Sequence, residues 1–370
     1  MLDRREFCRS LRAMVRRRGS HMCRIAFLFL LAVCVSVLNA CAQRSVPESD
    51  SAYVDEHGTA HVTRVVPVPK TVSPDAQAFM SQRRSDSEAP PSIADNRKTA
   101  DNWEETLARD MQGMYPTALV KDTIAGVSVR IVTPPNLPSE KRDRVLLNVH
   151  GGGFQADWGS VAETIPLASL TQTKVVAVLY RLAPENPFPA AVDDTVAVYQ
   201  ELLKTYKPQK IVLYGTSAGA ILTSEVAVRL KQLGLPLPAA LGVFSGLGDF
   251  SVHGDSEAIF GLWGLAGRLE IPEGRHDSSY VGNTNPRNPV LSPVYADLEG
   301  MPPTLFLTSE RDLLLSGTVN LHRAFVKAGV NAQLIVFDGL HHAFWNEFKL
   351  PESVEAHHMM AEFFEKHMAK

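Results

Sequence analysis

The feature that most constrains the fold of this chain is a regular alternation of short apolar runs and helical stretches that begins near residue 118. Two runs, Val120–Ile124 and Val127–Val132, flank Ala125-Gly126 and predict a β-hairpin. The later runs are almost continuously apolar, which is typical of strands buried on both faces of a sheet. Because helical stretches separate these runs, the pattern predicts an α/β fold with a mostly parallel, twisted sheet and helices on both faces. The expected strands are Arg144–Val149, Lys174–Tyr180, Lys210–Tyr214, Ala239–Ser245, Thr304–Thr308 and Ala332–Phe337, and the expected helices lie near 160–171, 190–206, 218–233, 316–328 and 352–368.

Composition and length agree with one large hydrophobic core. The chain has 370 residues, of which 45% are hydrophobic and 21% are charged. Its formal net charge of -3 gives neither the basic bias of a nucleic-acid-binding protein nor the acidic bias of a solvated tail, so no nucleic-acid partner is expected. All four cysteines lie in the first 41 residues, which excludes disulfides and thiol chemistry from the remainder. The first 40 residues therefore form a separate part of the sequence.

Residues 1–40 are typical of an export signal. Four arginines between residues 16 and 24 precede an apolar stretch of 14 residues, Ile25–Leu38. This stretch is short for a membrane span but has the length of the apolar region of a signal peptide. Met22 is an alternative start to Met1 and would give a shorter signal.

The end of this signal, Leu38-Asn39-Ala40-Cys41, resembles the bacterial lipobox. That resemblance implies that Cys41 is lipidated and becomes the mature N-terminus. Ordinary cleavage nearby and an uncleaved anchor are the alternatives, because Asn39 replaces the usual small residue. We therefore expect an exported protein on the periplasmic side, attached to the cell envelope only through this anchor. Ala42, rather than an aspartate, after Cys41 favours the outer membrane.

The polar stretch at residues 41–98 predicts an irregular tether ahead of a catalytic domain at 99–370. Large apolar residues between 103 and 114 recur at spacings near four, so we expect an amphipathic helix near 99–117, as a surface helix or as part of a lid. A Gly-rich, irregular segment at 247–290 interrupts the alternation of strands and helices. We expect it beside the carboxyl edge of the sheet, where it would form a substrate wall.

A serine lies in the turn Gly215-Thr216-Ser217-Ala218-Gly219, between the expected strand Lys210–Tyr214 and an expected helix. In a G-x-S-x-G turn of this kind the serine is held at the sheet edge as a nucleophile, and its small neighbours permit the sharp bend. A serine in front of a helix is also commonly a simple N-cap. The upstream string His150–Phe154 (HGGGF) favours the nucleophile, since its glycines can direct backbone N–H groups at an oxyanion.

A nucleophilic serine requires a histidine base held by a carboxylate, and in this fold the chain order is serine, acid, histidine. Asp312 follows one late strand by a few residues, and His341 and His342 follow the next. Glu310 and Asp338 are competing acids. Spacing alone leaves the choice between the two histidines open.

These strings together resemble the hormone-sensitive-lipase-like family of bacterial α/β-hydrolase esterases. The resemblance spans about residues 100–368 and implies an α/β-hydrolase fold with a small cap, formed by N-terminal helices and the segment near 250–290. The matching strings are HGGGF at 150–154, YRLAPE at 180–185, FPAA at 188–191, GTSAG at 215–219, ERD at 310–312 and HAF at 342–344.

The resemblance also implies the members of a catalytic triad, Ser217, Asp312 and His342. The family's last string usually reads His-Gly-Phe, so His342 is the implied base and His341 its neighbour. Ala343 stands where the family usually has glycine, which removes no catalytic group.

The oxyanion donors implied by the same resemblance are the N–H groups of Gly152, Gly153 and Ala218. His150 is interpreted as structural support for the glycine loop rather than as a second base.

The expected activity is hydrolysis of short- to medium-chain carboxylic esters through an acyl-enzyme intermediate, with a small-molecule ester as partner. No cofactor is expected, and no metal, because the histidines show no metal-ligand spacing with cysteines or carboxylates. A lactone hydrolase or amidase using the same triad is one alternative. A non-catalytic lipoprotein that binds a hydrophobic ligand is another.

Overall fold

The computed structural model describes residues 51–82, 92–265 and 278–368. The chain divides into two compact units, one ending at Pro67 and the other starting at Val68. The expected export signal and Cys41 lie outside the described residues. Among the residues that are described, no helix has both the length and the apolar character needed to span a bilayer.

The first unit contains an antiparallel hairpin in which β1 (Ser51–Val54) pairs with β2 (Ala60–Thr63). The prediction of an irregular tether over 41–98 is wrong for these residues. Asp55 fixes the turn, because its Oδ1 accepts hydrogen bonds of 2.9 Å from the N–H groups of His57 and Thr59. Such local side-chain bonds stabilise a turn without any apolar pattern in the sequence.

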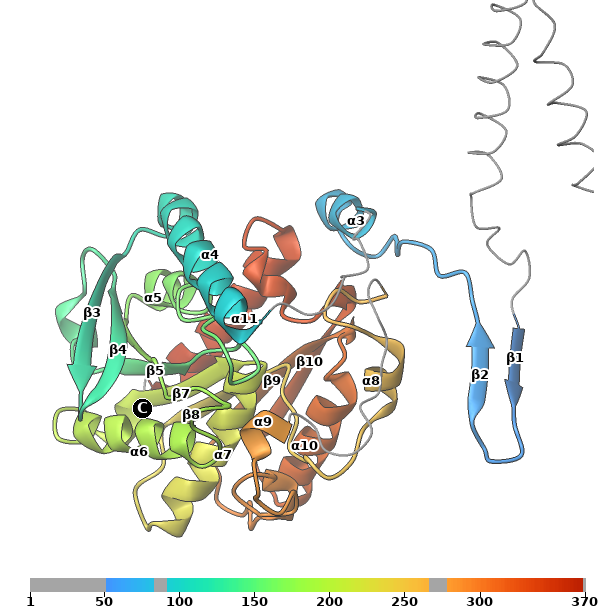
Figure 1. Ribbon diagram of the computed structural model, residues 1–370. Helices are drawn as coiled ribbons and strands as arrows, with labels where there is room; N and C mark the ends of the chain where they lie inside the picture. Colours follow the sequence, from blue (N-terminus) through green and yellow to red (C-terminus); the bar gives the residue numbers. More distant parts are fainter. Residues whose placement is uncertain (1–50, 83–91, 266–277, 369–370) are drawn as a thin grey trace, which may run out of the picture. The chain divides into compact units, whose positions relative to one another are not determined.

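The second unit is built around one sheet, whose strands are β3 (Ala118–Ile124), β4 (Val127–Thr133), β5 (Val145–Val149), β6 (Lys174–Val178), β7 (Ile211–Thr216), β8 (Ala240–Phe244), β9 (Thr304–Arg311) and β10 (Ala332–His341). The sheet has eight strands in the order β10-β9-β8-β7-β5-β6-β4-β3 (Figure 1). Strands β5 to β10 are parallel to one another, whereas β4 pairs antiparallel with β6 and forms the predicted antiparallel hairpin with β3 at one edge. This confirms the expected α/β architecture with a mostly parallel sheet.

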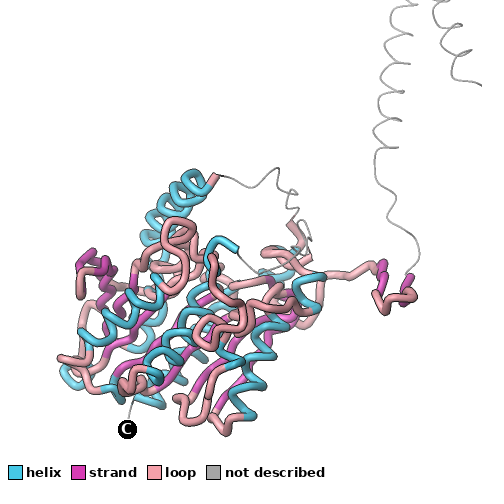
Figure 2. Tube along the Cα trace, turned by 60° about the horizontal axis from the view of Figure 1, so that its bottom comes forward, coloured by secondary structure: helices cyan, strands magenta, loops and turns pink. Residues whose placement is uncertain are grey.

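The helices of this unit are α3 (Pro74–Met80), α4 (Ile93–Met114), α5 (Ile165–Thr171), α6 (Ala190–Leu202), α7 (Ala218–Gln232), α8 (Asp255–Ile259), α9 (Ser278–Val281), α10 (Leu315–Lys327) and α11 (Pro351–Met368). They cover both faces of the sheet (Figure 2). Strand β5 illustrates why: Val145, Leu147 and Val149 join a core that includes side chains of α6, α7 and α10. Leu146, which points the other way, joins a core that includes side chains of α4, α5 and α11. Both faces of β5 are fully buried, as its almost continuously apolar sequence predicts.

Helices α3 and α4 begin inside the stretch expected to be irregular, which corrects the predicted boundary at residue 99. A serine caps each start: Ser73 Oγ accepts from the N–H of Ala76, and Ser92 Oγ accepts from the N–H of Asp95, both at 3.1 Å. Ser73 also donates from its N–H and its hydroxyl to the carboxylate of Glu352 in α11, at 2.5 and 2.9 Å. The segment from Val68 onward is therefore part of the folded unit.

The segment between β8 and β9 is irregular, as expected, apart from the short helices α8 and α9 and a few turns; residues 266–277 lie outside the description. Tyr280 of α9 stacks on Phe154, with ring centroids 3.4 Å apart and ring planes at 4°. Gln155 Nε2 also donates to Ser279 Oγ at 3.0 Å. Helix α9 therefore packs against the glycine loop that follows β5.

Candidate active site

Ser217 occupies a sharp turn between β7 and α7. Its backbone has φ 57° and ψ −122°, a conformation that is strained for a residue with a side chain and that clusters at functional sites. Gly215 and Gly219 permit the turn, because a Cβ atom added to either would overlap the carbonyl oxygen of Val149 in β5. The Ser217 hydroxyl makes no capping hydrogen bond to α7, so the alternative of a simple N-cap is wrong.

Gly219→Ala tests this steric argument. Since the added methyl group would overlap Val149 and crowd the backbone of His150, we expect a loss of about 1–3 kcal/mol of folding free energy, or more, together with a lower rate of the ester hydrolysis expected from the sequence. The melting temperature and kcat measure the two effects.

Gly113→Ala in α4 is the matched control for that variant. An added Cβ there has no atom within 4 Å, so stability should stay the same or rise by up to about 1 kcal/mol. Equal stability of the two variants would contradict the close approach of β5 and α7.

The glycine loop after β5 presents backbone N–H groups. Gly152 and Gly153 have φ values of 120° and 60°, and a Cβ on Gly152 would overlap the carbonyl oxygen of Ala156. In the described chain, the N–H groups of Gly152, Gly153 and Ala218 have no hydrogen-bond acceptor. Three free N–H donors on the two loops that follow adjacent parallel strands could donate hydrogen bonds to a developing oxyanion.

His150, which the sequence interpretation makes a support of the glycine loop, lies beside this loop. Its buried ring stacks on Tyr180 with centroids 4.3 Å apart, and its Nδ1 lies 2.8 Å from the carbonyl oxygen of Gly151. The Tyr180 hydroxyl donates to the carbonyl oxygen of His150 at 2.7 Å. These contacts leave the ring with a packing role beside the loop.

Asp312 and His342 are hydrogen-bonded, with 2.8 Å between Asp312 Oδ1 and His342 Nδ1. Asp312 is fully buried and also accepts from the Leu314 N–H and the Thr308 hydroxyl, both at 2.8 Å, and from the Ser245 hydroxyl. Burial raises the pKa of the Asp312 carboxyl, but the adjacent imidazole and these hydrogen bonds outweigh it and hold the pKa below its ordinary value. The carboxylate is thus charged and fixed beside the ring.

The alternatives left open by spacing do not share this geometry. The ring of His341 packs between Phe79 and Trp263, with centroid distances of 5.2 and 5.1 Å. Glu310 and Asp338 interact with each other instead of with His342. The hydrogen bond to Asp338 raises the pKa of Glu310, while bonds from Thr71 and from Glu310 lower that of Asp338.

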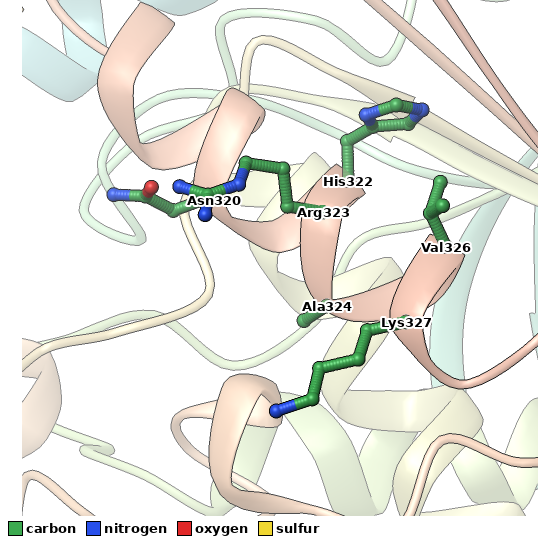
Figure 3. A pocket seen from close by; sticks show the side chains of 6 residues that line it. All are labelled: Asn320, His322, Arg323, Ala324, Val326 and Lys327. Atoms are coloured by element: carbon green, nitrogen blue, oxygen red, sulfur yellow. The ribbon is translucent and has the colours of Figure 1, made fainter.

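One surface hollow is lined by none of Ser217, Asp312 and His342. This hollow of about 470 Å³ is lined by residues of α10 alone, among them His322 and Arg323, whose side chains leave the helix in different directions (Figure 3). Over the described ranges, no group of three or more His, Cys, Asp or Glu side chains is arranged to hold a metal ion. Asp312, His342 and Ser217 instead follow parallel strands of one sheet, β9, β10 and β7, whose carboxyl ends share an edge.

Comparison with known proteins places this arrangement in a family. Residues 146–346 match a protein family described as having the alpha/beta hydrolase fold. The matched residues include the glycine loop, Ser217, Asp312 and His342. The chain belongs to the α/β-hydrolase family. Over 226 residues, this hydrolase is 33% identical to an acetyl-hydrolase of Streptomyces hygroscopicus, covering 59% of the chain and 74% of that protein. It is 31% identical over 230 residues to an esterase of Acinetobacter venetianus, covering 60% of the chain and 74% of the relative.

Solved structures indicate a narrower group within this family. A crystallised esterase superposes with a TM-score of 0.72 at 31% identity, covering 82% of this chain and 97% of the esterase. An esterase from the bacterial hormone-sensitive lipase family superposes with a TM-score of 0.66 at 29% identity, covering 80% and 99%. The α/β hydrolase is therefore a carboxylesterase-type enzyme of the hormone-sensitive-lipase-like group.

The sequence analysis did not predict the buried positions of two carboxylates of the hydrolase. Asp194 is buried and pairs with the Arg181 guanidinium at 2.8 Å. Glu163, in the expected helical stretch near 160–171, is buried beside both the glycine loop and the Ser217 turn. A single acid in an otherwise apolar stretch is the signal that could have identified Glu163.

Proposed function

We propose that the hydrolase cleaves short- to medium-chain carboxylic esters through a Ser217–His342–Asp312 triad and an acyl-enzyme intermediate. The observation that carries the proposal is the 2.8 Å hydrogen bond between His342 and the buried Asp312, at the sheet edge where Ser217 occupies its strained turn. A buried, charged acid that holds an imidazole is the arrangement that activates a serine hydroxyl in serine hydrolases.

The reaction follows from the positions of these groups. With Nδ1–H donated to Asp312, His342 keeps Nε2 free to take the proton of the Ser217 hydroxyl as Oγ attacks the ester carbonyl. The N–H groups of Gly152, Gly153 and Ala218 stabilise the negative charge on the tetrahedral intermediate. His342 returns the proton to the leaving alcohol, which breaks the ester bond and leaves the acyl group on Ser217. Water, deprotonated by His342, then releases the carboxylic acid and restores the serine.

A p-nitrophenyl ester series from acetate to palmitate tests the substrate class. We expect kcat/KM to be highest on short or medium acyl chains and to fall toward palmitate. The Streptomyces relative is named an acetyl-hydrolase, which makes acetyl esters the first substrates to measure. Highest activity on palmitate would contradict the proposed chain length, and activity only on lactones or amides would move the function to the alternatives that use the same triad.

A fluorophosphonate probe separates the enzyme from a ligand-binding protein of the same fold. We expect one labelled peptide, carrying the probe on Ser217, because the probe reacts only with an activated serine. A folded protein that takes up no label would instead support the non-catalytic alternative.

We further propose that the protein is exported and is anchored to the cell envelope by a lipid on Cys41, with the outer membrane favoured. The support is the sequence alone: the apolar stretch Ile25–Leu38 ends in a string that resembles a lipobox. Mass spectrometry of the mature N-terminus checks this, and an unmodified residue other than Cys41 at that end would refute it.

A further inference from the structure

The carboxylate of Glu163 connects the two loops that build the proposed site. Its Oε1 accepts a hydrogen bond of 2.9 Å from the N–H of Gly151, in the glycine loop. Its Oε2 accepts a bond of 3.1 Å from the N–H of Thr216, in the Ser217 turn. The side-chain amide of Asn148 in β5 donates to Oε2 at 2.9 Å, so each oxygen of this buried group is used.

The two backbone donors adjoin the atoms that would do the chemistry. Gly151 immediately precedes Gly152, whose N–H is a proposed oxyanion donor, and Thr216 immediately precedes the nucleophile Ser217. The loops also touch directly, since a Cβ added to Gly151 would lie 3.0 Å from the carbonyl oxygen of Thr216. A shift in either hydrogen bond of Glu163 would therefore change the distance between the oxyanion donors and Ser217 Oγ.

We propose that Glu163 is a positioning residue, which fixes the oxyanion loop and the nucleophile turn relative to each other. The inference rests on the proposed function, because it assigns a role within the ester-cleaving site. A buried carboxyl group is energetically unfavourable here, because burial disfavours its charged form. Hydrogen bonds from Asn148, Gly151 and Thr216 lower the pKa of Glu163, but burial outweighs them and raises it to about 8. A structural role alone could be filled by an apolar side chain, whereas joining two backbone donors requires two acceptor oxygens.

Glu163→Gln tests the inference with almost no change in shape. An amide nitrogen has no lone pair to accept a hydrogen bond. Whichever way the glutamine amide faces, the N–H of either Gly151 or Thr216 therefore loses its acceptor. Misplacing a reacting group by a fraction of an ångström to one ångström lowers the rate of the chemical step more than it weakens substrate binding. We expect kcat to fall by about 10- to 100-fold, KM to stay within about twofold, and fluorophosphonate labelling to slow in parallel with kcat.

Glu104→Gln is the matched control. Glu104 of α4 is as buried as Glu163, and neither loop donates a hydrogen bond to it, so kcat should stay within about twofold of the wild type. Activity is normalised to the sites that the fluorophosphonate titrates, so an unfolded fraction does not enter the comparison. If Glu163→Gln does not yield folded protein, Asn148→Ala removes one of the three donors and should lower kcat by about threefold at unchanged KM.

Three outcomes overturn the inference: wild-type kcat in Glu163→Gln, wild-type kcat in Asn148→Ala, or an equal fall in Glu104→Gln. All three differ from failure of the proposed function, in which the wild-type protein itself would show neither ester turnover nor labelling. A fall in kcat confined to Glu163→Gln and, more weakly, Asn148→Ala supports it.

Discussion

Ser217→Ala is expected to lower kcat for ester hydrolysis by about 10⁴- to 10⁶-fold, because it removes the hydroxyl oxygen that forms the proposed acyl-enzyme. The residual rate would come from the oxyanion N–H groups and substrate binding, which do not need the hydroxyl. The fold should be retained, since the Ser217 hydroxyl makes no capping hydrogen bond to α7. Steady-state kinetics measure the loss, and thermal melting checks the fold.

Ser224→Ala is the matched control for that variant. Ser224 is also buried and lies on the same helix, where its hydroxyl donates to the carbonyl oxygen of Ala220 at 3.3 Å. We expect near wild-type kcat from this variant. Turnover retained by folded Ser217→Ala protein would exclude Ser217 as the nucleophile and, with it, the proposed triad.

Asp312→Asn is expected to lower kcat by about 10³- to 10⁴-fold. The side-chain amide that replaces the carboxylate no longer carries the charge that stabilises a protonated His342. If its NH₂ group faces the ring, His342 Nδ1 must act as the acceptor, which places the ring proton on Nε2 and blocks the base. Binding groups are untouched, so the loss should appear in kcat more than in KM.

Asp338→Asn distinguishes Asp312 from a nearby acid. Asp338 lies within β10, close to its carboxyl end, but bonds to Thr71 and Glu310, so this variant should keep kcat within about twofold. If Asp338→Asn were the inactive variant and Asp312→Asn the active one, the assignment of the triad acid would be wrong.

Much of the fold follows from the sequence because its signal is local and repeated. Almost continuously apolar runs such as Val145–Val149 are buried on both faces, and the helices that separate them cover the sheet as expected. The boundaries near the N-terminus do not follow, because the β1–β2 turn and the starts of α3 and α4 depend on single polar side chains. Asp55, Ser73 and Ser92 each accept backbone hydrogen bonds, which the spacing of apolar residues does not predict.

The candidate site was predictable to the extent that it consists of short strings. Spacing favours Ser217 and Asp312 but leaves His341 and His342 equivalent, because they are neighbours in the sequence. Only tertiary contacts distinguish the two histidines. His342 is hydrogen-bonded to Asp312, while the ring of His341 packs against Phe79 of α3. Glu163 was missed for the same reason, since its partners come from two separate parts of the chain, the stretch that holds Asn148 and Gly151 and the turn that holds Thr216.

The bonds from Ser73 to Glu352 join residues that are 279 positions apart, and they have a kinetic consequence. The parallel sheet likewise pairs strands that are separated by whole helices, so few of its contacts are local in sequence. Chains with high contact order fold slowly, because loop-closure entropy is lost before long-range contacts form. This protein should therefore fold in a late, concerted step, in which α3 packs against α11.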